Sequence, residues 1–243
     1  MFGEIQNLQG NQLDYSFHSG KEDSDVLVVI GHGVTGNKDR PFVKTLAEGL
    51  ASAGIPTMRI SFSGNGNSGG SFQDCTITKE ISDLQSVLDV VSDGRRITYA
   101  GHSMGGAVGV LATSQDNRID YLISLAGMVH TAKFAKVEFG DQVPDHGCMW
   151  EDEDCPLSST YISDMNSIGS VLEKGAEIKI PWLLVHGTED DVVPIEETHE
   201  IFEKGTGPRK KVVIEGADHV FSEEKASDNM VQAVVSWLKG QLQ

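Results

Sequence analysis

The chain has 243 residues, a length that a single α/β domain commonly reaches, so we expect one domain over residues 1–243. Hydrophobic residues make up 39% of the chain and charged residues 23%, a composition that excludes a disordered protein. The net charge of −17 repels phosphate backbones and anionic lipid surfaces. We therefore expect neither nucleic acid nor a membrane as a partner.

The first residues carry neither a basic start nor an apolar run, and no uncharged stretch is long enough to span a bilayer. These observations predict a cytoplasmic protein. The three cysteines are Cys75, Cys148 and Cys155, and an odd number favours reduced thiols. A disulfide between Cys148 and Cys155 is the alternative. The sequence contains no signal for an oligomeric state.

Apolar and polar residues alternate at Leu13, Tyr15 and Phe17 after a turn signal at Gly10-Asn11, which predicts an antiparallel hairpin at a sheet edge. Six nearly continuous apolar runs follow along the chain. Such runs are typical of parallel strands that are buried on both faces. The runs cover residues 26–30, 55–62, 97–100, 121–126, 180–185 and 211–214.

Helical periods lie between these runs. Pro41 suits a first helical position, and Phe42, Leu46 and Leu50 recur on one face. Two further stripes are Ile81, Leu84, Leu88 and Val91, and Met230, Val234, Trp237 and Leu238. Strands that alternate with helices predict an α/β fold with a doubly wound, mostly parallel sheet. Residues 128–178 have no strong period, and we expect them to form a small insertion over the carboxyl edge of the sheet.

Residues 101–105 read Gly-His-Ser-Met-Gly and join a strand run to a helix-forming segment. The glycines permit a tight turn in which Ser103 has a strained backbone and presents its hydroxyl at the sheet edge, as a nucleophile requires. Met104 then offers a backbone N–H at a helix N-terminus, where negative charge is stabilised. The alternative is a glycine-rich turn with an ordinary serine. We expect the His102 side chain to point away from that of Ser103.

A serine hydroxyl needs an adjacent base, and His219 lies in the loop between the last strand run and the final helix. That loop should reach the same sheet edge as Ser103. His32 and His186 also follow buried strands, and for them we expect a structural or oxyanion-loop role. The remaining histidines have no supporting neighbours and are expected at the surface; they are His18, His130, His146 and His199.

The base in turn needs a carboxylate that fixes its tautomer and stabilises the imidazolium. Acidic residues are available at 189–191, in the loop after a buried strand, and at Asp218. One of them should be buried against His219. The others are expected to form a solvated acidic turn.

Backbone N–H groups that could hold a developing oxyanion are predicted in residues 31–38, after the first buried strand. The best donor there is Val34, which would act together with Met104. These residues lack the spacing and the Lys-Ser/Thr ending of a phosphate-binding loop. Residues 64–69 match G-x-G-x-x-G, but no acidic residue about twenty positions on ends a second strand, so we expect a pocket rim and no dinucleotide cofactor.

These motifs, in this order, resemble the α/β-hydrolase family over nearly the whole chain, and within it small cytoplasmic carboxylesterases such as cinnamoyl and feruloyl esterases. The motifs lie at residues 33–38, 64–68, 101–105 and 186–194. The resemblance implies a serine carboxylesterase that cleaves small-molecule esters through an acyl-enzyme, without metal or cofactor. It places the acid at the fifth position of the run that begins at His186, which is Asp190, with Asp191 as the competitor.

Other functions remain open, because the same fold and triad also serve thioesterases, aminopeptidases and acyltransferases, and an inactive form could serve as a ligand-binding module. In the esterases an insertion caps the pocket and selects the substrate, and residues 128–178 occupy the matching place. Within it, Met149 and Trp150 are expected to contact substrate. A metal site of His146, Cys148 and Cys155 fits no standard zinc spacing, so a solvated acidic loop is expected there.

Overall fold

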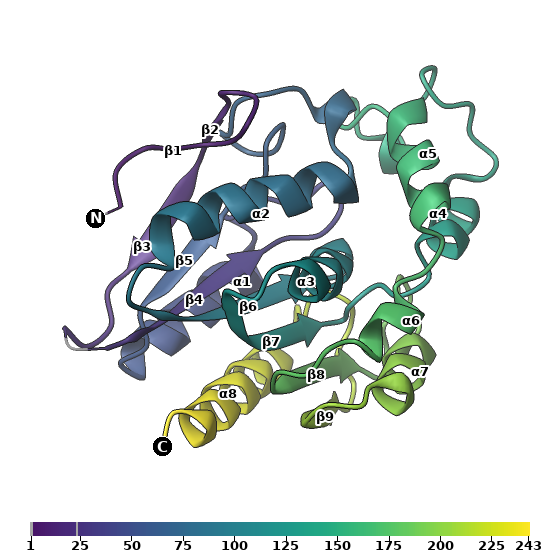
Figure 1. Ribbon diagram of the computed structural model, residues 1–243. Helices are drawn as coiled ribbons and strands as arrows, with labels where there is room; N and C mark the ends of the chain where they lie inside the picture. The colour runs from purple at the N-terminus through teal and green to yellow at the C-terminus, as the bar shows by residue number, and fades with distance from the viewer. Residues whose placement is uncertain (1, 23) are drawn as a thin grey trace.

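The computed structural model describes residues 2–22 and 24–243, and a seven-stranded sheet runs through its centre (Figure 1). The strand order is β3-β5-β4-β6-β7-β8-β9. β3 is antiparallel to β5, and all other neighbours are parallel, so the expected mostly parallel sheet is present. The strands are β3 (Tyr15–His18), β4 (Val26–Gly31), β5 (Thr57–Ile60), β6 (Arg96–His102), β7 (Ile119–Leu125), β8 (Trp182–Gly187) and β9 (Arg209–Ile214).

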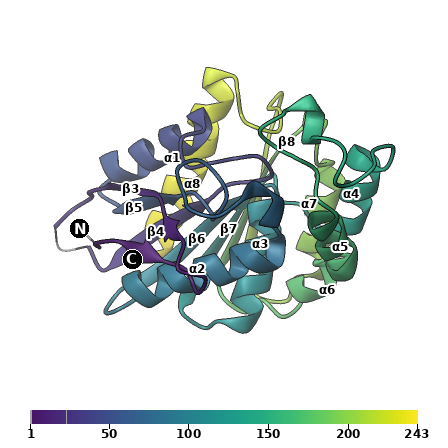
Figure 2. The same ribbon diagram turned by 90° about the horizontal axis from the view of Figure 1, so that it is seen from above.

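Helices cover both faces of the sheet (Figure 2). They include the three helices that the apolar stripes predict, and Pro41 begins the first of these. The helices are α1 (Pro41–Ser52), α2 (Ile77–Val91), α3 (Met104–Gln115), α4 (Thr131–Phe139), α5 (Ser159–Ile168), α6 (Leu172–Gly175), α7 (Ile195–Lys204) and α8 (Glu224–Gln241), with short 3-10 turns η1 (Phe72–Asp74) and η2 (Met149–Glu151). Within the described ranges, no helix combines the length and the apolar character that crossing a bilayer requires.

Each face of the sheet has its own hydrophobic core. Along β4, Val26, Val28 and Ile30 pack on one side with side chains of α1 and α8. Leu27 and Val29 point to the other side and pack with side chains of α2 and α3. Because helices cover both faces, β4 is apolar at every position and does not alternate, which explains its continuous run in the sequence.

The N-terminal hairpin differs from the prediction. β1 (Ile5–Gln6) and β2 (Gln12–Leu13) form an antiparallel pair, but this pair is a separate two-stranded sheet. Only β3, which starts at Tyr15, joins the edge of the large sheet. Leu13 and Tyr15 thus belong to two different strands, and the prediction of a single hairpin at the sheet edge was wrong.

Residues 128–178 leave the sheet after β7 and contain α4, η2, α5 and α6. Their inner sides share an aromatic cluster in which the Phe139 ring centroid lies 5.1 Å from that of Trp150 and 6.2 Å from those of Phe134 and Tyr161. Each helix of this segment buries only a few apolar side chains, too few to give a clear helical period. This explains why the sequence pattern did not predict them.

Candidate active site

The candidate nucleophile Ser103 lies in the turn between β6 and α3. Its φ of 53° and ψ of −119° form a left-handed backbone conformation that residues other than glycine rarely adopt. A side chain at Gly101 would collide with the Gly105 carbonyl, and a Cβ at Gly33 would come within 2.7 Å of the Ser103 Cβ. Glycine at these positions therefore makes the tight turn possible.

Backbone hydrogen bonds hold this strained turn in place. The Ser103 N–H donates to the carbonyl of Leu125 at the end of β7, at 3.0 Å. The Ser103 carbonyl accepts from the N–H groups of Gly106, at 2.8 Å, and Met128, at 3.0 Å. Since Met128 begins the segment 128–178, the turn is fixed both by the sheet and by the base of that segment.

The structure brings the predicted acid and the predicted base together. The His219 Nδ1–H donates to Asp190 Oδ2 at 2.8 Å, and the Asp190 side chain is fully buried. Asp190 Oδ1 accepts from the backbone N–H groups of Val192, at 3.0 Å, and Val193, at 2.8 Å. Burial alone would raise the pKa of Asp190, but hydrogen bonds from His186 and His219 outweigh it and hold that pKa well below its usual range. Asp190 is therefore a carboxylate at neutral pH.

His186, for which the sequence predicted a structural or oxyanion-loop role, lies beside Asp190. Its ring is fully buried, and its Nδ1 accepts from the Thr198 hydroxyl at 2.7 Å. Its Nε2–H is shared between the Val193 carbonyl, at 2.9 Å, and Asp190 Oδ2, at 3.0 Å. Asp190 thus receives hydrogen bonds from two histidines, and His186 keeps the carboxylate oriented toward His219.

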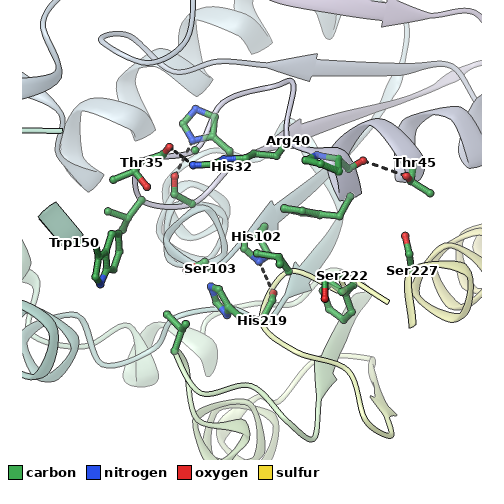
Figure 3. Close-up of a pocket in the computed structure, with 18 of the residues that line it drawn as sticks. His32, Thr35, Arg40, Thr45, His102, Ser103, Trp150, His219, Ser222 and Ser227 are labelled. Atoms are coloured by element: carbon green, nitrogen blue, oxygen red, sulfur yellow. Dashed lines mark hydrogen bonds between the residues drawn. The ribbon is translucent and has the colours of Figure 1, made fainter. Parts of the chain in front are cut away.

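Ser103 and His219 line the same cavity, which has a volume of about 760 Å³ (Figure 3). A volume of this order is typical of small-molecule sites. Among the described residues, no hydrogen bond joins the Ser103 hydroxyl to the His219 ring. Such bonds are often long in ligand-free enzymes and shorten when substrate binds, so the shared cavity is the informative observation.

The two predicted oxyanion donors are the backbone N–H groups of Val34 and Met104. Val34 lines the cavity from the loop after β4, and Met104 follows Ser103 directly as the first residue of α3. Within the described ranges, neither N–H has a hydrogen-bond acceptor in the protein. Free N–H groups beside a nucleophile are what an oxyanion requires.

His32 orders the loop that carries Val34. Its Nε2 accepts from the Phe62 N–H at 3.0 Å, so its Nδ1 carries the proton and donates to the Gly33 carbonyl at 2.9 Å. Burial lowers the pKa of His32 to about 4, and the ring is therefore neutral at physiological pH. These contacts give His32 a structural role in the loop that carries Val34.

The two residues of the segment 128–178 that were predicted to contact substrate lie in different environments. Trp150 is 44% exposed, lines the cavity, and donates its Nε1–H to Glu138 at 2.8 Å. Its backbone is left-handed, with φ of 51° and ψ of 36°. Met149 is 2% exposed, packs in the hydrophobic core and does not line the cavity. The prediction for Met149 is therefore not supported, because its side chain points into the core.

Two of the four histidines that were expected at the surface, His18 and His130, are half-buried and have side-chain partners. His18 Nε2 accepts from the Arg59 Nε–H at 2.9 Å. His130 Nε2 lies 2.7 Å from a Glu200 carboxylate oxygen. As for metals, the part of the chain that the structure describes holds no group of three or more His, Cys, Asp or Glu side chains placed to bind one.

Comparison with known proteins adds independent findings. Residues 43–243 match the family described as the prolyl oligopeptidase family. A structure of Est1E from Butyrivibrio proteoclasticus with ferulic acid bound superposes with a TM-score of 0.88, 25% identity and 98% of both chains covered. Alpha/beta hydrolase domain-containing protein 10 from mouse superposes with a TM-score of 0.81, 19% identity and 99% of both chains covered.

A curated relative is the mitochondrial palmitoyl-protein thioesterase ABHD10 of Bos taurus. It is 25% identical over 209 residues, which are 79% of this chain and 66% of the bovine protein. The chain therefore spans slightly less than two thirds of that relative's length.

Proposed function

The chain belongs to the prolyl oligopeptidase family and has the α/β-hydrolase fold, and on this basis we propose that it is a serine hydrolase that cleaves small carboxylic esters through an acyl-enzyme on Ser103. One observation carries the proposal. The Nδ1–H of His219 is bound by the buried carboxylate of Asp190 at 2.8 Å, beside a serine in a strained turn. This arrangement supports a Ser-His-Asp triad.

In the first half of the proposed reaction, the Ser103 oxygen attacks the ester carbonyl carbon while His219 Nε2 accepts the hydroxyl proton. The carbonyl oxygen becomes an oxyanion, which the N–H groups of Val34 and Met104 stabilise. The bond to the alcohol oxygen then breaks, and His219 returns the proton to the leaving alcohol. Asp190 remains ionised and stabilises the imidazolium during this step.

In the second half, a water molecule replaces the alcohol. His219 accepts a proton from this water as its oxygen attacks the acyl carbon, and the same two N–H groups hold the second oxyanion. The bond to Ser103 breaks, the proton returns to the serine oxygen, and the carboxylic acid leaves. Every proton passes through His219, so no cofactor is needed for this chemistry.

We also propose that residues 128–178 act as a cap that binds the acyl group. Phe134 of α4, Trp150 of η2 and Val192 of the β8–α7 loop give the cavity an apolar side near Ser103. The cavity extends past His219 in the other direction, toward α1 and α8, where Thr45 and Ser227 lie (Figure 3). Apolar walls near the nucleophile favour an alkyl or aryl acyl group, and the far arm leaves room for the alcohol.

The experiment that tests this function is a panel of acetyl, butyryl and octanoyl groups, each supplied as an oxygen ester and as the matching thioester. We expect the oxygen ester to be hydrolysed at each acyl length, because His219 can protonate the departing alkoxide, which is a poorer leaving group than a thiolate. No hydrolysis of any oxygen ester by folded protein would contradict the proposal.

A thioesterase is the second candidate, since relatives named palmitoyl-protein thioesterase match 79% of the chain at 25% identity. The acyl-enzyme would be the same, and only the leaving atom differs. Higher kcat/KM for the thioesters throughout the same panel would favour this candidate over the esterase.

Shortening Trp150 to alanine is predicted to change acyl selectivity. The variant should lose roughly tenfold in kcat/KM for octanoyl esters, because lost apolar contact of this kind is worth about 1–3 kcal/mol. Acetyl esters should be affected less than about twofold, since a short acyl group does not reach the indole. Steady-state kinetics on the ester panel measures both values.

Val137→Ala is the matched control, because Val137 is an exposed apolar residue of α4 that does not line the cavity. This variant should leave the ratio of octanoyl to acetyl rates unchanged. If Trp150→Ala lowers both rates equally, the proposed cap does not select the acyl group.

A further inference from the structure

His102, which precedes the proposed nucleophile, is 5% exposed and lies on the cavity wall. Its Nε2 lies 2.8 Å from the backbone carbonyl oxygen of His219 (Figure 3). Because a carbonyl oxygen only accepts hydrogen bonds, the Nε2 of His102 carries the proton and donates it. The bond therefore joins the residue next to Ser103 to the backbone of His219.

Two further contacts fix the His102 ring. Its centroid lies 4.4 Å from that of Phe42 and 4.6 Å from that of the His219 imidazole. Burial, together with the positive charge on His219, lowers the pKa of His102 to about 3. His102 thus stays neutral while His219 gains and loses its proton, and its Nε2–H remains a constant donor.

Asp190 alone does not fix the position of His219. It holds the imidazole through Nδ1, which sets the tautomer and the direction of the ring. The backbone of the loop has its own contacts, including Glu189 N–H to the Ala217 carbonyl at 3.0 Å and Phe221 N–H to the Asp218 carbonyl at 3.2 Å. These contacts lie on either side of His219, and the bond from His102 joins the His219 peptide group to the nucleophile turn.

We propose that His102 is a positioning residue whose Nε2–H bond to the His219 carbonyl sets the distance between the His219 ring and the Ser103 hydroxyl. The inference rests on the proposed function, because it requires His219 to act as the base. His102 itself transfers no proton. A displacement of about 1 Å between reacting groups can lower a rate by roughly 10²-fold, which gives this bond its importance.

Two amide variants test whether the hydrogen bond itself is needed or whether any side chain at position 102 suffices. Glutamine carries its amide nitrogen as many bonds from Cβ as histidine carries Nε2, whereas the asparagine nitrogen is one bond closer and cannot reach the His219 carbonyl. We expect His102→Gln to keep kcat within about threefold of wild type and His102→Asn to lower it by about 10- to 100-fold, with KM changed by less than about threefold in both.

His102→Phe is a third variant, which keeps an aromatic ring beside Phe42 and His219 but has no donor. It should lose kcat as His102→Asn does. The rate of labelling by a fluorophosphonate probe, measured on folded protein for all three variants, should follow the same order as kcat. Thermal unfolding midpoints identify any variant that fails to fold. The remaining two variants then test whether the hydrogen bond from His102 is needed.

The inference is overturned if Gln and Asn lower kcat equally, if the Phe variant matches wild type, or if the losses occur in KM alone. Ser103→Ala measured in parallel keeps this outcome apart from a failure of the proposed function. An active Ser103→Ala enzyme would reject the triad itself. An inactive Ser103→Ala enzyme with unchanged His102→Asn would reject only the role of His102.

Discussion

Ser103→Ala is expected to lower kcat for ester hydrolysis by at least roughly 10³-fold in a protein that still folds. Alanine removes the oxygen that attacks the ester, and water in its place has no pre-formed position beside His219. The binding steps should be little affected, so KM should stay near its wild-type value. Steady-state kinetics with a nitrophenyl ester measures the change.

The matched control for this variant is Ser227→Ala, because Ser227 also lines the cavity but lies on α8. This change should leave kcat within about twofold of wild type, as is usual for a partly exposed side chain outside the reacting groups. Retention of activity in Ser103→Ala, or an equal loss in both variants, would remove Ser103 from the proposed mechanism.

Asp190→Asn is expected to lower kcat by about 10⁴-fold at neutral pH, the size of the effect in a comparable triad. The Asn oxygen can keep the hydrogen bonds from the Val192 and Val193 N–H groups. Its NH₂ group then faces His219 Nδ1 and forces the tautomer in which Nε2 carries the proton. That ring cannot accept the proton of Ser103.

The same NH₂ group also meets the Nε2–H of His186, which lies 3.0 Å from Asp190 Oδ2. Two donors then face each other in a buried site, and we expect a loss of about 1–3 kcal/mol in the free energy of unfolding. The kinetic comparison should therefore be made below the unfolding midpoint of the variant.

Asp191→Asn provides the comparison, because Asp191 is the neighbouring acid and is exposed to solvent. Its replacement should change kcat only a few fold, since a surface charge is screened by water and salt. A larger loss in Asp191→Asn than in Asp190→Asn, for two folded proteins, would transfer the role of the acid to Asp191.

The elements that were predicted correctly are those whose physical cause lies in the local sequence. The interior strands β4, β6 and β8 are covered on both faces, so their apolar runs stand out. β9 was expected to be buried on both faces, and this was wrong. It lies at the edge of the sheet, where of its residues only Ile214 is fully buried and Val213 is 44% exposed.

α7 was missed for a different reason. Its buried face includes Glu197 and Thr198 together with Ile201, so a hydrophobic stripe is absent. Glu197 is buried because its carboxylate accepts from the N–H groups of Val129, at 2.8 Å, and His130, at 3.1 Å. A polar residue that is buried through partners far away in sequence cannot be distinguished from a surface residue by pattern alone.

The same limit applies to the candidate site. Ser103 and His219 could be named because their loops follow strands that end at one sheet edge, whereas Asp190 was chosen among the neighbouring acids by the family resemblance. The contacts of His186 with Asp190 and of His102 with the His219 carbonyl depend on side-chain directions within those loops. His130 and Glu200 are 70 residues apart, and only the packing of α7 against the start of the segment 128–178 brings them together.

The central claim, that Ser103 is the nucleophile, is tested most directly by identifying the residue that a fluorophosphonate probe modifies. The wild-type enzyme is inactivated with the probe, digested and analysed by mass spectrometry. We expect one adduct, on the hydroxyl of Ser103, which forms in step with the loss of esterase activity and is absent from Ser103→Ala. Inactivation with the adduct on another residue, or an active enzyme that forms no adduct, would contradict the central claim.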